Sequence, residues 1–243
     1  MCGRFTVTSP GDVAAEFGVE VPLELSPRYN VAPTDPVAVI VDKDGRRAEL
    51  MRWGLVPHWA KDRSIASKMI NARAESLDSR PAFRDALSRR RCLIPADGFY
   101  EWKREGKHRT PYYVHLPDRR LFAFAGLWER WKQPDGEWLI TFTIITTDAN
   151  DLVAPIHDRM PLIVDPADYE RWLDPEPTPR EALDDILAGP SPPVVAPGQA
   201  GRDPRHWWGR PANPPALEMF EVSRLVNSVR NEGPQLVEPA VGQ

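Results

Sequence analysis

Short runs of alternating apolar and polar residues occupy the middle of the chain and predict β-strands. Residues 36–56 alternate around Asp44-Gly45, a dipeptide typical of tight turns, and so predict a hairpin. Turn residues separate the later runs at Gly106, at Asp118 and at 134–136. We expect the later strands 91–103, 110–117, 120–131 and 137–147 to follow one another and to pair antiparallel, and a further strand is predicted at 159–164.

Helical signals are short and scattered. Residues 9–18 predict an early helix, with Ser9 as the N-cap, Pro10 at the first helical position and Gly18 as the terminator. Three more short helices are predicted at 81–91, 148–155 and 166–173. Because helices and strands do not alternate regularly, the sequence favours an α+β domain over a doubly wound sheet.

The composition changes at residue 174. From there to about 215 the chain is rich in proline, begins with an acidic stretch and contains the aromatic motif HWWG. A short helix is predicted around 180–188, and the rest is interpreted as a loop or partly disordered insertion. The pattern of a folded domain resumes at 217, so we expect one domain over 2–238 that carries this insertion.

Composition narrows the class of protein. The 243 residues include two cysteines far apart in sequence, which makes a disulfide framework improbable and a reducing cytoplasm the expected compartment. The apolar runs are too short for a transmembrane helix, and no secretory signal is visible. The five histidines show no metal-ligand spacing, so we expect neither metal nor cofactor.

Charge is unevenly distributed. The net charge is −4, yet residues 50–110 carry 14 Lys and Arg against 7 Asp and Glu. Residues 174–203 carry 6 acidic and 2 basic residues, which accounts for the whole negative balance. A basic sector with interleaved tryptophan and tyrosine suits a single-stranded nucleic-acid groove, although a solvated charged face explains the same pattern.

Cys2 stands directly behind the initiator methionine. Removal of Met1 would expose an α-amine beside a thiol, and these two groups can trap an aldehyde as an imine and then as a thiazolidine ring. An N-terminal nucleophile that uses its own amine as base is another use of such a residue. On position alone, a simple small second residue is the favoured interpretation.

Three other stretches carry candidate chemistry. Asn71 and Arg73 alternate in INARAES, where they can fix a reactive group and bind an anion, or simply begin a turn. Glu101 lies between aromatic residues in a strand, where it is either a proton-transfer group or a solvent-facing side chain. His157 precedes a buried strand, beside Asp158, and is either a proton shuttle or structural.

Seven motifs occur together in order and resemble one family. They are MCGRF, RYNVAPT, RWGLVPHWA, INARAE, CLIPADGFYEW, IHDRMPLIV and VSRLVN, and they span roughly residues 2–173 and 216–238. They are similar to those of the SOS-response-associated peptidase family, whose members crosslink to abasic sites in single-stranded DNA. The resemblance implies a mostly antiparallel, barrel-like strand core with peripheral helices. It also implies a monomer whose partner is single-stranded DNA with an abasic site, with nucleoid association when bound.

The resemblance also implies roles for individual residues. Cys2 matches the cysteine that forms the thiazolidine after methionine removal, and Asn71 matches the asparagine that positions it. Glu101 matches the glutamate that assists proton transfer, and His157 the histidine implicated in crosslink reversal. Autoproteolytic removal of the leading residue is the associated peptidase activity. The residues matching a DNA path are Arg4, Arg73 and Arg159 for phosphates and Trp59 and Trp102 for bases.

Two departures from the family pattern and two rival functions remain. Members often carry two adjacent tryptophans where this chain has His58-Trp59, and the insertion at 174–215 has no assigned role. Glutamine amidotransferases of the N-terminal-nucleophile type also begin Met-Cys-Gly, so an amidohydrolase is the alternative enzyme. A noncatalytic single-stranded DNA-binding module is the second rival.

Overall fold

The computed structural model describes residues 2–21, 25–189 and 217–240. Five strands close into a barrel, because each pairs with two neighbours in the cyclic order β10, β4, β3, β6, β9 and back to β10. Closure pairs both edges of every barrel strand. The strands are β3 (Pro36–Asp42), β4 (Arg46–Trp53), β6 (Arg91–Ala96), β9 (Phe122–Lys132) and β10 (Trp138–Asp148). The α+β class with a barrel-like core is therefore confirmed.

Buried aromatic rings fill the barrel. The indole of Trp53 stacks on Phe142 with ring centroids 6.3 Å apart and meets Phe5 edge-on at 5.2 Å. All three side chains are fully buried, and both arrangements are ones that aromatic quadrupoles favour. The predicted hairpin over 36–56 is confirmed, since β3 and β4 pair antiparallel with Asp42 opposite Arg46.

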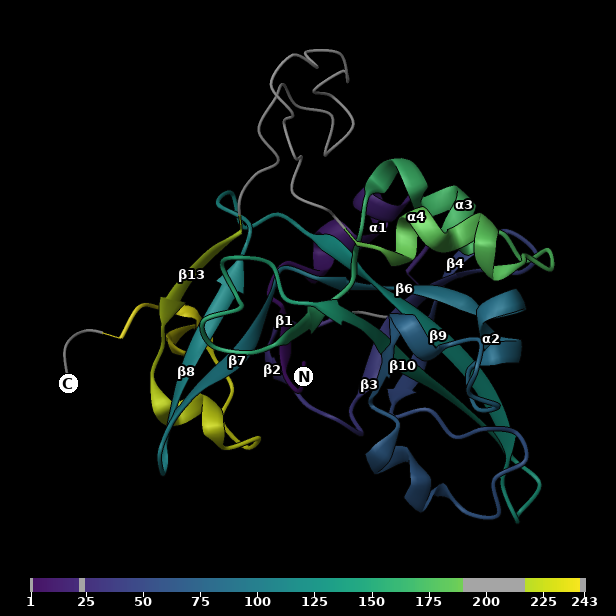
Figure 1. The fold of residues 1–243 in the computed structure, drawn as a ribbon, viewed down its shortest axis with the longest axis horizontal. Coiled ribbons are helices and arrows are strands. Elements are labelled where there is room, and N and C mark those ends of the chain that lie inside the picture. Colours follow the sequence, from purple (N-terminus) through teal and green to yellow (C-terminus); the bar gives the residue numbers. More distant parts are fainter. Residues whose placement is uncertain (1, 22–24, 190–216, 241–243) are drawn as a thin grey trace.

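A second sheet stands beside the barrel (Figure 1). Its strand order is β13, β8, β7, β1, β2, and all four pairings are antiparallel. Strand β13, the last in sequence, brings the chain after residue 217 back to this sheet and pairs with β8, with Phe220 opposite Tyr113. The strands are β1 (Phe5–Val7), β2 (Arg28–Val31), β7 (Gly98–Glu105), β8 (His108–His115) and β13 (Glu218–Glu221).

The predicted strand 91–103 is in fact two strands, β6 and β7, which belong to different sheets. The break is at Asp97, whose buried carboxylate accepts hydrogen bonds from Thr6 Oγ1 at 2.5 Å and Thr8 Oγ1 at 2.7 Å. A Cβ at the next residue, Gly98, would lie 2.3 Å from the Tyr113 ring, so only glycine fits this close approach. Asp97 and Gly98 therefore turn the chain from the barrel into β7.

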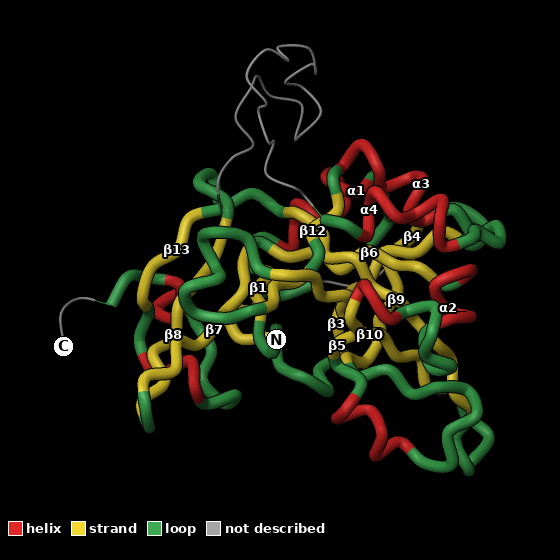
Figure 2. Tube along the Cα trace, in the orientation of Figure 1, coloured by secondary structure: helices red, strands yellow, loops and turns green. Residues whose placement is uncertain are grey.

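The helices are short and lie around the strands (Figure 2). The predicted helices at 9–18, 81–91 and 166–173 are all present, and Gly18 ends the first with a left-handed φ of 60°. Ser9 makes no side-chain capping bond; its amide instead donates to Asp97. The α-helices are α1 (Val13–Phe17), α2 (Arg84–Arg89), α3 (Tyr169–Leu173) and α4 (Asp184–Leu187). The 3-10 helices are η1 (Pro10–Asp12), η2 (Arg63–Lys68), η3 (Ala74–Ser76), η4 (Pro166–Asp168), η5 (Arg180–Leu183), η7 (Arg224–Asn227) and η8 (Pro234–Val237).

The predicted helix at 148–155 is wrong. Strand β10 continues to Asp148, and turns follow over 151–156. Asn150 Oδ1 accepts the amide of Val153 at 3.0 Å, a local bond that competes with regular helix. Pro155 removes a further donor. The predicted strand 159–164 is present but broken at Leu162 into β11 (Arg159–Pro161) on β10 and β12 (Ile163–Val164) on β9.

The first part of the predicted insertion packs against the body of the domain. The helix expected around 180–188 is confirmed as η5 and α4, and it buries Leu183, Ile186 and Leu187. The remainder, from 190 to 216 with the HWWG motif, lies outside the described residues. Among the helices that are described, none is long and apolar enough to cross a membrane.

Candidate active site and nucleic-acid interface

The start of the chain is held against β7. Phe5 pairs with Phe99, and the amide of Tyr100 donates to the carbonyl of Arg4 at 3.0 Å. Continuing this antiparallel register brings residues 2 and 3 alongside Glu101. Cys2 is fully buried there. The sheet therefore fixes the position of the terminal cysteine.

Asn71 fixes the terminal cysteine from the other side. It lies on the short strand β5 (Asn71–Arg73), which pairs parallel with β10 and places Asn71 opposite Ile144. Its Nδ2 donates to the carbonyl oxygen of Cys2 at 2.8 Å. Its Oδ1 is buried and has no hydrogen-bond partner within the described chain, so it can accept a bond from a ligand or from the processed terminus.

Glu101 and Cys2 share one electrostatic environment. Burial raises the pKa of the Glu101 carboxyl, and His157 opposes that rise when its ring is protonated. Burial also raises the pKa of the Cys2 thiol, and the charge of Glu101 raises it further. A carboxylate with a raised pKa next to a neutral thiol is suited to taking and returning a proton.

His157 lies in the turn before β11, with its imidazole partly exposed. Its Nδ1 accepts the backbone amide of Arg159 at 2.9 Å and also lies 2.9 Å from an Asp158 carboxylate oxygen. The amide bond requires a lone pair on Nδ1, whereas the Asp158 contact suits a protonated ring. Because Asp158 is exposed and the amide is fixed by the backbone, we assign the proton of the neutral imidazole to Nε2.

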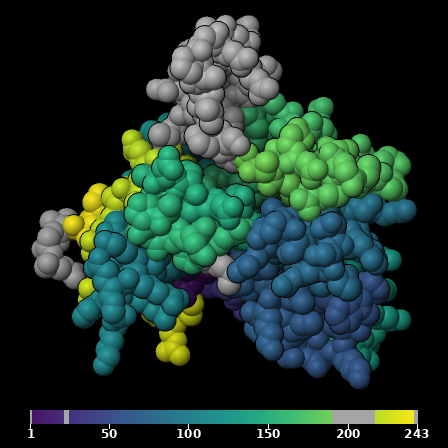
Figure 3. Space-filling model, in the orientation of Figure 1, coloured from purple at the N-terminus to yellow at the C-terminus, as the bar shows by residue number. Residues whose placement is uncertain are grey.

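A groove runs past His157. Its volume is about 380 Å³, and it lies between Trp102, Lys103 and Arg104 of β7 and the turn over 155–158 that carries His157. Figure 3 shows the N-terminal residues, in purple, recessed between the teal and the blue surfaces. Trp102 is held at the edge of the groove by a 2.7 Å bond from its Nε1 to Asn227 Oδ1.

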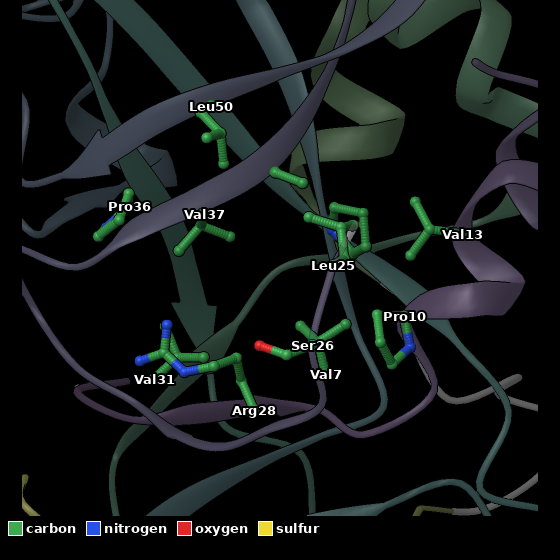
Figure 4. A pocket seen from close by; sticks show the side chains of 12 residues that line it. Val7, Pro10, Val13, Leu25, Ser26, Arg28, Val31, Pro36, Val37 and Leu50 are labelled. Atoms are coloured by element: carbon green, nitrogen blue, oxygen red, sulfur yellow. The ribbon is translucent and has the colours of Figure 1, made fainter. Parts of the chain in front are cut away.

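A second hollow, of about 260 Å³, lies elsewhere and is apolar. The side chains of Val13, Leu25, Val37 and Leu50 surround it (Figure 4). Its charged residue, Arg28, pairs with Asp35 at 2.6 Å and Glu232 at 3.1 Å. It contains none of the predicted site residues, whereas Trp102 and His157 line the groove.

The three predicted phosphate-binding arginines differ in their surroundings. Arg73 is exposed and forms no ion pair with any described residue. The Arg4 Nη1 atom donates to Asn30 Oδ1 at 3.0 Å and to the carbonyl of Val226 at 2.9 Å, and burial lowers the pKa of this guanidinium. Arg73 therefore has its whole guanidinium available to an anion, and Arg4 only part of it.

Arg159 is buried and its terminal nitrogens are occupied. They donate to Asp148 Oδ1 at 2.6 Å, to Glu75 Oε2 at 2.7 Å and to the carbonyl of Thr146 at 2.8 Å. These bonds tie the residues after β5 to β10 and β11. The surroundings of Arg159 therefore favour a structural role, in which it clamps these segments together, over the predicted phosphate contact.

Trp59 is 52% exposed, as a base-stacking residue must be. Its neighbour His58 lies 3.4 Å from the buried carboxylate of Glu129. Arg90 also pairs with that carboxylate, at 2.9 Å. His58 thus anchors the loop that presents Trp59.

Comparison with known proteins identifies the family. The model of the SOS response associated peptidase (SRAP) family matches residues 1–196. The chain belongs to the SRAP family. It is 42% identical to the abasic site processing protein YoqW of Bacillus subtilis, over 98% of this chain and 99% of that one. It is 33% identical to the abasic site processing protein HMCES of Gallus gallus, over 88% of this chain and 66% of the relative.

A solved structure shares the SRAP fold described above. A protein from Bacteroides thetaiotaomicron superposes with a TM-score of 0.80 and 25% identity, covering 99% of this chain and 100% of the other. In this SRAP chain, no three His, Cys, Asp or Glu side chains of the described residues gather to hold a metal ion.

Sequence reasoning missed one residue that organises this SRAP site. Asn30 is buried at the end of β2 and donates to the carbonyls of Ser228 at 2.9 Å and Asn231 at 3.0 Å, while its Oδ1 accepts from Arg4. It therefore joins the start of the chain to its C-terminal segment. The available signal was an amide between the apolar positions of RYNVAP, which predicts a buried polar group.

Proposed function

We propose that this protein processes abasic sites in single-stranded DNA by forming a covalent crosslink through Cys2. The observation that carries the proposal is the 2.8 Å bond from Asn71 to the Cys2 carbonyl, which holds the terminal residue beside Glu101. The names of the relatives, which are abasic site processing proteins, support the same substrate.

The proposed chemistry needs both groups of Cys2. After Met1 is removed, the α-amine attacks C1′ of the ring-opened sugar, and the resulting carbinolamine loses water to give an imine. The thiol then adds to the imine carbon, and its proton passes to the nitrogen as the thiazolidine ring closes. One water leaves in total, and no oxidant or reductant is required.

Glu101 is proposed to move the protons. Its carboxylate accepts one from the incoming amine and returns it to the departing hydroxyl, a task that suits a group whose pKa is raised by burial. His157, which lines the groove, is proposed to act on the opened sugar during formation and reversal. Asn71 holds the cysteine and offers its Oδ1 as an acceptor.

DNA binding is proposed to use the exposed groups around the site. Arg73 and the remaining donors of Arg4 contact phosphates, and Trp59 and Trp102 stack on flanking bases, each stack contributing ~1–3 kcal/mol. A site without a base leaves room for the terminus to reach C1′, which selects the lesion by shape and not by sequence. Removal of Met1 is the proposed peptidase reaction.

Intact-mass spectrometry and a denaturing gel test this function. The mature protein is expected to lack Met1 and to form an adduct with abasic single-stranded DNA that survives denaturation. Cys2→Ala is expected to abolish the adduct, and an adduct that persists in this variant overturns the mechanism. Glutaminase activity without any adduct would favour the amidohydrolase instead.

A second pair of variants separates the roles of the side chains. Asn71→Leu nearly keeps the size of the side chain and adds no charge but removes the donor to the Cys2 carbonyl, so we expect slower adduct formation at unchanged DNA affinity. His157→Ala is expected to slow release from the preformed adduct. Release at the wild-type rate would make His157 structural.

A further inference from the structure

A basic surface beside the groove is not used by the proposed chemistry. It is formed by the tip of the β7–β8 hairpin and by residues 223–231 of the C-terminal segment, and we call it the shelf. Figure 1 shows these two segments side by side, in teal and yellow, next to the N-terminus. The shelf residues used below are Arg104, Arg109, Arg224, Leu225, Val229 and Arg230.

The two parts of the shelf are held together by specific contacts. Trp102 Nε1 donates to Asn227 Oδ1 at 2.7 Å, and the amide of Val222 donates to the carbonyl of Pro111 at 3.0 Å. Trp102 and Pro111 face each other in the hairpin, two positions before the facing pair Arg104 and Arg109. Two residues of strand span about 7 Å, so the arginine pair lies about that far along the hairpin from these contacts.

The arginine pair has no internal partner. Arg104 and Arg109 lie directly opposite each other on adjacent strands, an arrangement that like charges destabilise. Both are exposed, and neither forms an ion pair with any described residue. The neighbouring acid, Glu105, pairs with Lys103 at 2.7 Å. An external anion would relieve this repulsion.

The C-terminal part of the shelf adds charge and apolar surface. Residues 223–231 contain two arginines and no acidic residue, and Arg224 and Arg230 are both exposed. Leu225 is 51% exposed and Val229 is 54% exposed, which makes them two of the most exposed large apolar side chains described. The acid that follows, Glu232, pairs with Arg28 at 3.1 Å.

The shelf connects directly to the proposed active site. The carbonyl of Val226, in the middle of this segment, accepts the bond from Arg4 at 2.9 Å. Trp102 and Arg104, at the base of the hairpin, also line the groove that contains His157. A DNA strand that leaves the groove past Trp102 therefore passes over the shelf.

We propose that the shelf binds the single-stranded DNA on one side of the abasic nucleotide. Its arginines contact successive phosphates, and Leu225 and Val229 pack against sugars and base faces. This inference rests on the proposed function and extends it by defining a flanking subsite that lies outside the reacting centre.

Salt-dependent binding tests the shelf. Full-length protein is titrated, by fluorescence anisotropy, with a single-stranded oligonucleotide that carries a tetrahydrofuran abasic analogue, which has no aldehyde and binds only reversibly. The variants are Arg104→Gln with Arg109→Gln, and Arg224→Gln with Arg230→Gln. The matched control, Arg84→Gln with Arg89→Gln on α2, removes the same charge from exposed positions away from the groove.

Each shelf variant is expected to lower the slope of log K against log salt by about 1.4, because each single-strand phosphate contact contributes about 0.7. If a shelf variant and wild type bind equally at 1 M salt, a slope lower by 1.4 corresponds to about 25-fold weaker binding of the variant at 0.1 M salt. The control is expected to keep the wild-type slope. Leu225→Ser with Val229→Ser is expected to weaken binding without changing the slope.

Trimming the oligonucleotide locates the subsite. Shortening one flank to two nucleotides is expected to erase the difference between wild type and shelf variants, whereas shortening the other flank preserves it. Shelf variants that bind like the control overturn the inference, as does a loss that both flanks share. Failure of the proposed function is distinguishable, because then the wild-type protein forms no adduct with a true abasic site.

Discussion

Replacing Arg159 with methionine distinguishes a clamp from a phosphate contact. The substitution keeps an apolar stem of similar width but removes the bonds to Glu75, Asp148 and the carbonyl of Thr146. The Glu75 and Asp148 carboxylates are 54% and 91% exposed, so the loss of each pair costs only ~0–1 kcal/mol. The carbonyl of the fully buried Thr146 loses a donor, which costs about 1–3 kcal/mol.

The expected loss of unfolding free energy for Arg159→Met is therefore about 3 kcal/mol, the middle of these ranges. For a domain of this size the melting temperature falls by ~2–4 °C per kcal/mol, which gives a decrease of about 6–12 °C. The measurement is thermal unfolding followed by circular dichroism, with urea unfolding as an independent estimate.

Arg73→Met is the matched control. Arg73 carries the same charge nearby, is exposed, and forms no ion pair within the described residues. We expect its stability to stay within about 0.5 kcal/mol of wild type while DNA affinity falls. If Arg159→Met melts at the wild-type temperature and loses only DNA affinity, the interpretation of Arg159 as a clamp is wrong and Arg159 contacts a phosphate.

Three further predictions follow from buried groups. Burial raises the pKa of Glu101 in the folded protein, so the ionised side chain destabilises the fold at any pH above the pKa of Glu101 in the unfolded chain. Glu101→Gln is therefore expected to raise the melting temperature more at pH 7 than at pH 4. The same variant is expected to form the adduct more slowly. Asn30→Ala is expected to lower the free energy of unfolding by about 2 kcal/mol. Because it also releases Arg4, we expect faster proteolysis within residues 222–238, with the cleavage sites identified by mass spectrometry. Cys2 and Cys92 are both buried, and burial raises the pKa of each thiol. Iodoacetamide is therefore expected to label both slowly in the native protein and rapidly in urea. Fast labelling of Cys92 in the native protein would contradict its burial.

The local parts of the fold were predictable because local chemistry determines them. The turn at Asp44-Gly45, the terminator Gly18 and the proline-initiated helix at 166 each depend on a few neighbouring residues, and each is present. The closure of the barrel was not visible in the residues. It depends on the parallel pairing of β4 with β10, two strands almost ninety positions apart, as in Arg52 with Thr141. Period-two alternation indicates a strand but not its partner.

The site was predictable only in part for a related reason. The motifs identified Cys2, Asn71 and Glu101, and the structure brings the first into contact with the second and near the third. The state of each arginine depends on partners from elsewhere in the chain, so sequence reasoning treated Arg73 and Arg159 alike. One is exposed and the other is surrounded by acceptors from β10 and η3.

In the proposed mechanism, the way Cys2 is held requires that its α-amine be unmodified. The β1–β7 pairing and the Asn71 bond fix its carbonyl and its backbone, so the residue cannot move outward to meet a substrate. The proposed mechanism therefore needs the aldehyde to approach the α-amine where it stands. An extra residue before Cys2 converts that amine into an amide, whose nitrogen cannot form an imine. A tag left at this end is thus expected to block the reaction while every side chain remains in place.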